Sequence, residues 1–226
     1  MGTPGQLVVN RYRLVRALGQ GSMGVVWEGR DTLLDRPIAI KEILFPPGLR
    51  TQQEIELGHR ISRAARTAQR VTHPNLVAVY DVAEEDGRPW IVMELVHSRA
   101  LDRVIATDGV LSVDKAVATI SPVLAALEAV HAAGLVHGDV KPANVLIGYD
   151  GRVVLSDFGM ASFDGSPEYQ APEGQRTPAA DLWALGATLY TMVTGRAPER
   201  VPDLEAVPEP LRPVVRGLLA KEPAKR

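Results

Sequence analysis

Residues 136–146 read Val136-His137-Gly138-Asp139-Val140-Lys141-Pro142-Ala143-Asn144-Val145-Leu146. They place a carboxylate, an ammonium and a carboxamide on one short loop, followed by an apolar run typical of a strand. A loop held between a helix and a strand can aim such side chains at a substrate. Asp139 could act as a base, Lys141 could neutralise phosphate charge, and Asn144 could bind a hard cation. The simpler alternative is a solvated polar turn.

Composition excludes several classes of function. The 226 residues, 46% of them hydrophobic, can bury one large core or the cores of two small lobes. The net charge of −2, without a basic block, disfavours nucleic acid or a membrane surface as partner. The absence of cysteine excludes disulfides, thiolate metal sites and cysteine nucleophiles. No apolar run approaches the roughly 18 residues of a membrane span, and no secretory signal is present, so we expect a cytoplasmic location.

The first part of the chain has the pattern of a sheet with one helix. Residues 1–10 are expected to form a loose leader. Proline, glycine and period-two alternation then predict three strands, a polar surface helix and a hairpin: Tyr12–Gly19, Val25–Gly29, Pro37–Lys41, helix Thr51–Arg70, and Leu76–Asp81 with Trp90–Leu95.

From about His97 the hydrophobic period becomes helical. A helix is expected over residues 113–130 with Ser112 as N-cap, and Pro122 predicts a kink or break in it. A second hairpin, a buried helix that Gly195 ends, and a last helix follow: Val145–Ile147 with Val153–Leu155, Pro178–Thr194, and Pro210–Ala220.

Three further motifs carry chemistry, and each has a plainer alternative. Gly19-Gln20-Gly21-Ser22-Met23-Gly24 lies between two strands, so it could cover phosphates with backbone N–H groups or be an ordinary flexible hairpin. Lys41 ends an apolar strand, where its ammonium could meet a phosphate or extend into water. Asp157-Phe158-Gly159 offers a carboxylate that could join Asn144 in a Mg²⁺ site.

Together these motifs resemble the eukaryotic-type protein kinases, and more closely the bacterial serine/threonine kinases. Six motifs occur in the family's order: Gly19–Val26, Ile38–Lys41, His137–Asn144, Asp157–Gly159, Ala171-Pro172-Glu173 and Asp181–Gly186. The match runs from about Arg11 to Arg226. It implies an α+β, two-lobed kinase fold, with an N-lobe over 11–95 and a C-lobe over 96–226 that is truncated after its last helix.

The resemblance also implies roles for individual residues in binding ATP with Mg²⁺ or Mn²⁺. Asp139 would accept the substrate hydroxyl proton, Lys141 would stabilise the γ-phosphoryl group, and Lys41 would hold the α/β-phosphates. Asn144 and Asp157 would hold the metal. The remaining nucleotide contacts would come from Leu18, Gly19, Gly21, Gly24, Val26, Ala39, Met93, Glu94, Val96 and Leu146. Glu173 and Arg226 match the pair that ties the activation segment to the C-lobe.

Four departures from the family pattern change this interpretation. Ala64 stands where the helix should offer a glutamate to Lys41, and Glu54 and Glu56 lie eight or more residues earlier, about 12 Å back along that helix. Gly138 replaces the arginine that usually receives an activation-loop phosphate. Only residues 160–164 separate Asp157-Phe158-Gly159 from the segment that begins at Gly165. The proline-rich segment from Gly195 to Pro210 leaves little room for a substrate-docking helix.

We therefore expect a minimal, active kinase that loop phosphorylation does not regulate. Losing the glutamate partner of Lys41 costs ~2–4 kcal/mol of transition-state stabilisation by analogy with an oxyanion donor, or about 30- to 1,000-fold in rate. One alternative is a pseudokinase that binds nucleotide or acts as a scaffold. Another is a small-molecule kinase of the aminoglycoside phosphotransferase type, which also uses His-Gly-Asp. The protein substrate stays unidentified, and the domain could be the cytosolic part of a longer, membrane-anchored protein.

Overall fold

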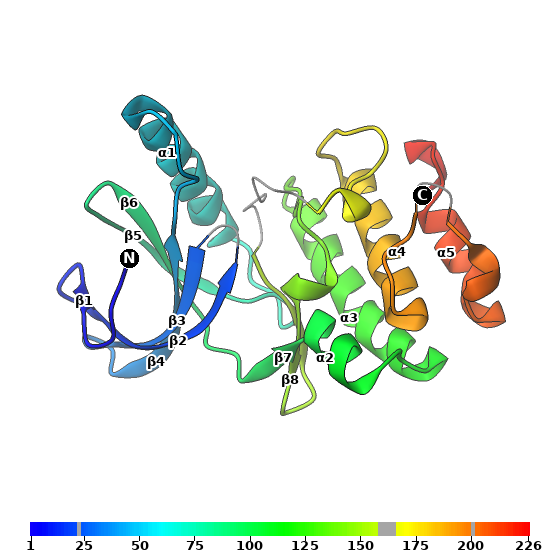
Figure 1. Cartoon of the computed structure of the whole chain (residues 1–226), viewed down its shortest axis with the longest axis horizontal. Coiled ribbons are helices and arrows are strands. Elements are labelled where there is room, and N and C mark those ends of the chain that lie inside the picture. The colour runs from blue at the N-terminus through cyan, green and yellow to red at the C-terminus, as the bar shows by residue number, and fades with distance from the viewer. Residues whose placement is uncertain (22–23, 158–165, 200–201) are drawn as a thin grey trace. The chain divides into compact units, whose positions relative to one another are not determined.

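The computed structural model describes the whole chain except residues 22–23, 158–165 and 200–201 (Figure 1). The chain divides into two compact units. The first contains Met1–Thr72 and Val77–Val96, and the second contains His73–Leu76 and the described residues from His97 onward. A sheet dominates the first unit and helices dominate the second, as the sequence predicts for an α+β chain.

The first unit is built on a six-stranded antiparallel sheet in the order β1-β2-β3-β4-β6-β5. Its strands are β1 (Leu7–Val8), β2 (Tyr12–Gly21), β3 (Gly24–Asp31), β4 (Arg36–Ile43), β5 (Val79–Glu85) and β6 (Arg88–Met93). Successive side chains of a strand point to opposite faces. One face carries a core that includes Val25, Trp27, Ile38, Ile40 and Val92. The side chains of the residues adjacent to them in sequence therefore lie on the other face of the sheet.

The expectation of a loose leader over residues 1–10 is wrong. Strand β1 lies in this segment and pairs with β2, and Val8 is fully buried. The Gly2 amide donates to both carboxylate oxygens of Glu42, at 2.8 and 3.0 Å, and the Val9 amide donates to Glu85 at 2.8 Å. The sequence concealed this pairing because a two-residue strand has no measurable alternation.

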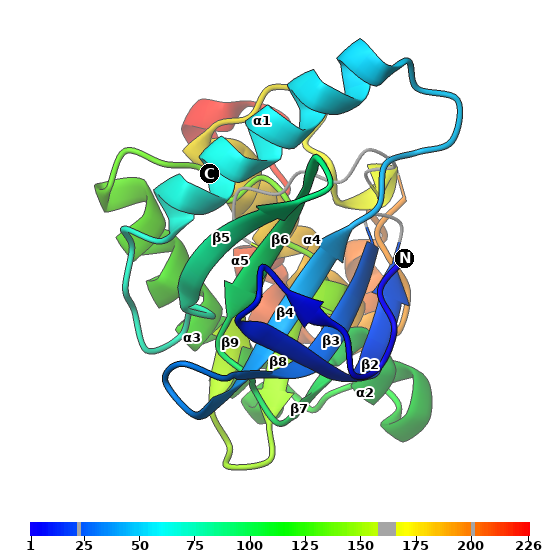
Figure 2. The same ribbon diagram turned by 90° about the vertical axis from the view of Figure 1, so that its left-hand side faces the viewer.

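Helix α1 (Thr51–Ala68) matches the predicted helix within two residues. Figure 2 shows it running alongside β5 and β6, and it packs against both strands. Its buried side includes Leu57, Ile61 and Ala65 at helical spacing. Just past its end, the Gln69 side chain donates to the Tyr80 carbonyl at 2.7 Å, which fixes the helix to β5.

The second unit contains four α-helices and a three-stranded sheet among its described residues. These are β7 (Ser98–Ala100), α2 (Leu101–Asp108), α3 (Val113–Ala132), β8 (Val145–Gly148), β9 (Val153–Leu155), α4 (Pro178–Thr194) and α5 (Arg212–Leu218). The predicted bounds of α4 are confirmed at both ends, with Thr177 as N-cap and Gly195 in the left-handed conformation. The expectation of a break at Pro122 is wrong, because α3 continues through this residue as one helix.

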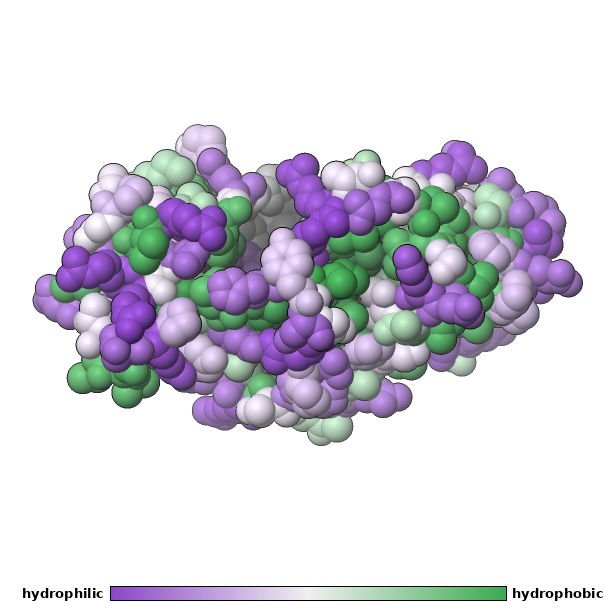
Figure 3. Space-filling model, turned by 90° about the horizontal axis from the view of Figure 1, so that it is seen from below, coloured by the Kyte–Doolittle hydropathy of each residue, from purple (hydrophilic) through white to green (hydrophobic). Residues whose placement is uncertain are grey.

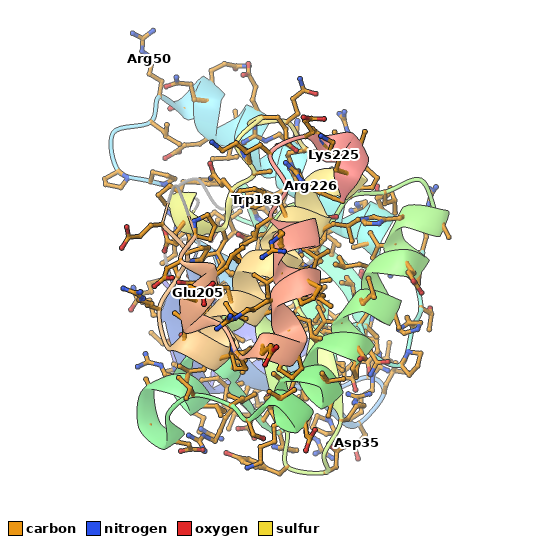
Figure 4. All side chains as sticks on the ribbon, turned by 90° about the vertical axis from the view of Figure 1, so that its right-hand side faces the viewer. Asp35, Arg50, Trp183, Glu205, Lys225 and Arg226 are labelled. Carbon is orange, nitrogen blue, oxygen red and sulfur yellow. The ribbon has the colours of Figure 1, made fainter. Side chains whose placement is uncertain are left out.

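Helix α4 is the core of the second unit. Every residue from Trp183 to Val193 is buried, and α3 and α5 pack against it. Arg226, the last residue of the sequence, packs against this core near the start of α4, with its guanidinium 5.0 Å from the centre of the Trp183 ring (Figure 4). The same guanidinium donates to both carboxylate oxygens of Glu173, at 2.6 and 2.9 Å. The pairing of Glu173 with Arg226 expected from the sequence is confirmed.

Between α4 and α5 the described residues form only two short 3-10 turns, η3 (Leu204–Ala206) and η4 (Glu209–Leu211). Arg212 holds this segment by donating to the Val207 carbonyl at 2.8 Å and pairing with Glu205 at 2.8 Å.

The face in Figure 3 carries hydrophilic residues dispersed among smaller hydrophobic patches. In the described ranges, no helix combines the length and the hydropathy of a membrane span.

Candidate active site

Four of the expected nucleotide-contacting residues share one face of the first unit's sheet. Val26 lies opposite Lys41 where β3 pairs with β4, and Ala39 lies opposite Met93 where β4 pairs with β6. Directly opposed residues of an antiparallel pair point the same way, and Ala39 and Lys41 are two residues apart. Val26, Ala39, Lys41 and Met93 therefore present their side chains on the face opposite the Trp27 core.

Lys41 is buried on this face, with 6% of the residue exposed. Burying an ammonium is costly unless anionic or polar groups surround it, so this position suits a phosphate-binding lysine. On α1, Ala64 is half-buried, and Glu56 is exposed and accepts a hydrogen bond from Gln52 at 3.1 Å. The absence of a helix carboxylate near Lys41 stays a prediction.

The glycine-rich motif forms the expected hairpin between β2 and β3, with Gly21 opposite Gly24. A Cβ atom at Gly24 would lie 1.8 Å from the Glu42 carbonyl oxygen, and Gly24 has a φ of +141°. Only glycine permits this close approach of β3 to β4. Leu18 is exposed beside a register shift in β2, and Gly19 has nothing within 4 Å of a hypothetical Cβ. Ser22 and Met23 lie outside the described residues.

The segment after β6 restricts how the backbone could meet an adenine. The Glu94 amide donates to the Ala78 carbonyl at 2.9 Å. Because that N–H group is committed, any backbone contact from Glu94 to a nucleotide must use its carbonyl oxygen. Val96, two residues further on, ends the stretch Val77–Val96 of the first unit.

In the second unit the three polar residues of the 136–146 loop come together. The Lys141 ammonium lies 2.9 Å from one carboxylate oxygen of Asp139. The Asn144 side-chain amide donates to the other carboxylate oxygen at 2.9 Å and to the Asp139 backbone carbonyl at 2.7 Å. The 3-10 turn η1 (Pro142–Asn144) brings the asparagine back toward the aspartate. These contacts fix the carboxylate between a cation and an amide, which the polar-turn alternative does not require.

Asn144 is also tied to the residue that precedes Asp157. The Ser156 amide donates to the Asn144 carbonyl at 2.8 Å, and the Ser156 hydroxyl donates to the same oxygen at 3.1 Å. The pairing of β8 with β9, which includes Leu146 opposite Val154, holds the two segments together. Asp157 has a φ of +61°, an uncommon conformation for a non-glycine residue that often marks a functional position. Phe158 and Gly159 lie outside the described residues.

Asn144 and Asp157 have the donor chemistry that Mg²⁺ prefers. Both N–H groups of the Asn144 amide point to Asp139, so its carboxamide oxygen is the atom left to bind a cation. Within the described part of the chain, no group of three or more His, Asp or Glu residues forms a metal cluster. A site of one carboxylate and one carboxamide fits a metal that keeps waters and also binds phosphate oxygens.

Asp181 anchors the loop, a role that the sequence did not predict. Its carboxylate accepts the amides of His137 at 2.8 Å and Gly138 at 2.7 Å, and it contacts Nε2 of His131 at 2.8 Å. Asp181 lies in the first turn of α4 and is 1% exposed. A carboxylate in the first turn of a buried helix indicates that polar partners lie nearby, because a buried charge needs them, although the sequence does not say which residues they are.

His137 is a fully buried, neutral spacer beneath the loop. The Asp139 amide donates to its Nδ1 at 3.2 Å, so its proton resides on Nε2, which faces the Ser156 carbonyl at 3.0 Å. Burial lowers the pKa of His137, although the carboxylates of Asp181 and Asp139 act in the opposite direction. The neutral ring thus links the residue before Asp157 to the backbone of Asp139.

A pocket of about 370 Å³ opens beside the loop within the second unit. Pro142 of η1 and Tyr169 of the segment that follows residue 165 both line it. The rest of its wall is mainly apolar and comes from α2, α4 and the residues that follow each helix: Ile105, Ala106, Val110, Thr191 and Ala197, with Asp102 and Arg196. The Tyr169 hydroxyl lies 3.2 Å from that of Thr191, which fixes the wall to α4.

Comparisons with known proteins agree with this architecture. Residues 12–226 match the protein kinase domain family. The chain is 36% identical over 216 residues to the probable serine/threonine-protein kinase CE0033 of Corynebacterium efficiens, covering 85% of this chain and 32% of that protein. It is 34% identical over 210 residues to the serine/threonine-protein kinase PrkC of Bacillus subtilis, covering 86% and 32%. The chain thus spans about a third of the length of these curated relatives.

Solved structures give the same answer for the fold. The crystal structure of the Mycobacterium tuberculosis PknI kinase domain superposes with a TM-score of 0.86 at 31% identity, covering 100% of this chain and 93% of that one. The expected two-lobed kinase fold is confirmed. The chain belongs to the protein kinase family, and the relatives it matches are bacterial serine/threonine-protein kinases.

Proposed function

We propose that this domain transfers the γ-phosphoryl group of ATP to serine or threonine hydroxyls of protein substrates. The observation that carries the proposal is the contact set of Asp139, whose carboxylate meets Lys141 at 2.9 Å and Asn144 at 2.9 Å. A solvated turn does not need a carboxylate held between a cation and an amide. A loop that must align a base with a hydroxyl does.

Each residue then has a defined part in the reaction. Asp139 accepts the proton of the substrate hydroxyl while the hydroxyl oxygen forms a bond to the γ-phosphorus. The bond between that phosphorus and the bridging oxygen breaks, and ADP leaves with the electron pair. Lys141 neutralises charge on the transferring group, and Lys41 holds the α/β-phosphates. A magnesium or manganese ion held by Asn144 and Asp157 would supply charge neutralisation at the phosphates.

The rest of the nucleotide has a place in the same proposal. The glycine hairpin of Gly19, Gly21 and Gly24 would cover the phosphates with backbone N–H groups. The adenine would meet apolar side chains and the backbone that follows β6: Leu18, Val26, Ala39, Met93, Glu94, Val96 and Leu146. The relatives are about three times longer than this chain. We propose that the domain works in the cytoplasm, where ATP is available, with further regions of a longer protein supplying regulation.

The proposal includes a form of regulation that differs from the common one. Gly138 offers no side chain to receive a phosphate, so phosphorylation of Ser162 or Ser166 should leave the rate unchanged. Ser162 lies outside the described residues. Phosphatase treatment and the Ser162→Ala and Ser166→Ala variants should each keep the wild-type rate, and a many-fold loss in any of them would contradict this part of the proposal.

The decisive experiment is phosphoryl transfer from γ-labelled ATP to a generic basic protein with Mg²⁺ or Mn²⁺. Asp139→Asn and Lys41→Met should each reduce labelling at least 100-fold. Asp86→Asn, in the β5–β6 turn, and Lys115→Met, on α3, are exposed matched controls that should keep full activity. Equal labelling by all the variants would refute the assignments. Binding of Mg-ATP without any transfer would instead identify a pseudokinase.

A further inference from the structure

Arg176 lies directly against Gly138, the residue that departs most clearly from the family pattern. A Cβ atom built on Gly138 would lie 2.1 Å from Nη2, 2.5 Å from Nε and 2.6 Å from Cζ of Arg176. The guanidinium therefore fills the space that a side chain at 138 would need. Nη2 also donates to the His137 carbonyl at 3.3 Å.

The peptide that leads into Asp139 is consequently held from two sides. Asp181 accepts the amides of His137 and Gly138, and Arg176 donates to the carbonyl of His137. Gly138 has a φ of +76°, a conformation that side chains other than those of Asn and Asp rarely adopt. The two anchors lie on either side of Thr177, the N-cap of α4, because Arg176 precedes it and Asp181 lies in the first turn of the helix. One end of α4 thus clamps both polar sides of this peptide.

We propose that Arg176 is a positioning residue for Asp139, supplying from the start of α4 a guanidinium in the place of an arginine at 138. The proposal rests on the proposed function for its kinetic consequence. It explains how the loop stays ordered when Gly138 provides neither a side chain nor a phosphate receiver. A guanidinium suits this position, because a glycine leaves room for its Nε–Nη2 edge and Nη2 donates to the His137 carbonyl at the same time.

The kinetic test compares Arg176→Ala with Arg216→Ala, an exposed arginine of α5. A displaced base slows the chemical step without weakening nucleotide binding. We expect Arg176→Ala to lower kcat about tenfold or more, with KM for ATP within twofold and Tm within a few degrees of wild type. Arg216→Ala should match wild type. Equal kcat values for the two variants would overturn the proposal.

A double-mutant cycle separates positioning from general damage. Asn tolerates positive φ, so Gly138→Asn adds a side chain that displaces Arg176 with little backbone strain. Gly138→Asn should lower kcat as Arg176→Ala does, and the double variant should lose little more, because both changes remove one contact. Independent, multiplying losses would contradict the shared mechanism.

A second measurement does not depend on activity. Hydrogen exchange of the peptides covering residues 136–146 should be faster in Arg176→Ala than in Arg216→Ala. Faster exchange in a protein without transfer activity would mean that the proposed function fails while the clamp stands. Unchanged exchange at this loop, in an active protein or an inactive one, would refute the clamp.

Discussion

Removing Glu173 tests whether the pair with Arg226 stabilises the second unit. The Arg226 side chain is 0% exposed and that of Glu173 is 16% exposed, with their closest atoms 2.6 Å apart. Arg226 also donates to the carbonyls of Ala220 at 2.7 Å and Ala179 at 3.1 Å, so it cannot simply turn to water. Breaking a buried pair by removing one partner costs about 3–5 kcal/mol, because a buried charge is left uncompensated. The small exposure of Glu173 places Glu173→Ala near 3 kcal/mol.

The matched control lies close by in the sequence. Glu222 pairs with Lys225 at 2.9 Å, but these side chains are 68% and 64% exposed. An exposed pair contributes about 0–1 kcal/mol. Thermal unfolding should therefore show Tm lowered by roughly 6–12 °C in Glu173→Ala and by at most about 4 °C in Glu222→Ala. Equal shifts in the two variants would refute the reasoning that burial makes the first pair strong.

The pH dependence of the same pair gives an independent check. The guanidinium of Arg226 lowers the pKa of Glu173, so the folded state releases its proton more readily than the unfolded state. The pair's contribution is present above the unfolded-state pKa and is lost as pH falls through the folded-state pKa. The stability difference between wild type and Glu173→Gln should shrink on acidification from pH 7. A difference that does not vary with pH would contradict this linkage.

Three other predictions test the rest of the structure. Gly24→Ala should lower the free energy of unfolding in urea by about 2 kcal/mol, because the added Cβ meets the Glu42 carbonyl. The control Gly21→Ala should cost much less, because nothing lies within 4 Å of a Cβ there. Similar losses in the two variants would contradict the close approach of β3 to β4. Burial lowers the pKa of His137, so below about pH 6.5 the unfolded state binds more protons than the folded state, and stability should fall as pH falls. The slope of unfolding free energy against pH between pH 7 and 5 should be shallower in His137→Gln than in wild type, by up to about 1.4 kcal/mol per pH unit. Identical slopes would refute this. Ala106→Trp should fill the pocket beside Pro142 and raise KM for a protein substrate without changing KM for ATP, and an unchanged protein KM would show that substrates do not use that pocket.

The parts of the fold that the sequence predicted are those with strong local signals. Thr177, Pro178 and Gly195 define both ends of α4 because an N-cap, a proline in the first turn and a left-handed glycine act within a few residues. Helix α2 escaped prediction because it spans only eight residues and buries only Leu101. The break considered at Pro122 does not occur, because a proline's local penalty can be outweighed by tertiary packing, here of the buried face of α3.

In the site, too, the features with a local sequence signal were predicted and those that depend on distant contacts were not. The loop around Asp139 was predicted from its motif, and its three polar residues do meet. The anchors of that loop were not predicted, because Asp181 and Arg176 lie 44 and 39 residues from the atoms of His137 that they bind. Contacts over such separations depend on how α4 packs, which no local pattern encodes.

The distance of Asp181 from the loop also has a consequence for synthesis. The Asp139 loop is translated 44 residues before the carboxylate that fixes the amide of His137. At ~5–20 residues per second, that interval is roughly 2–9 s. During this time the strands of the first unit have already been made, because they all lie before residue 97. A nascent chain at this stage can order its sheet while the loop carrying Asp139 still lacks its anchor, so the proposed phosphoryl transfer should begin only after α4 has folded.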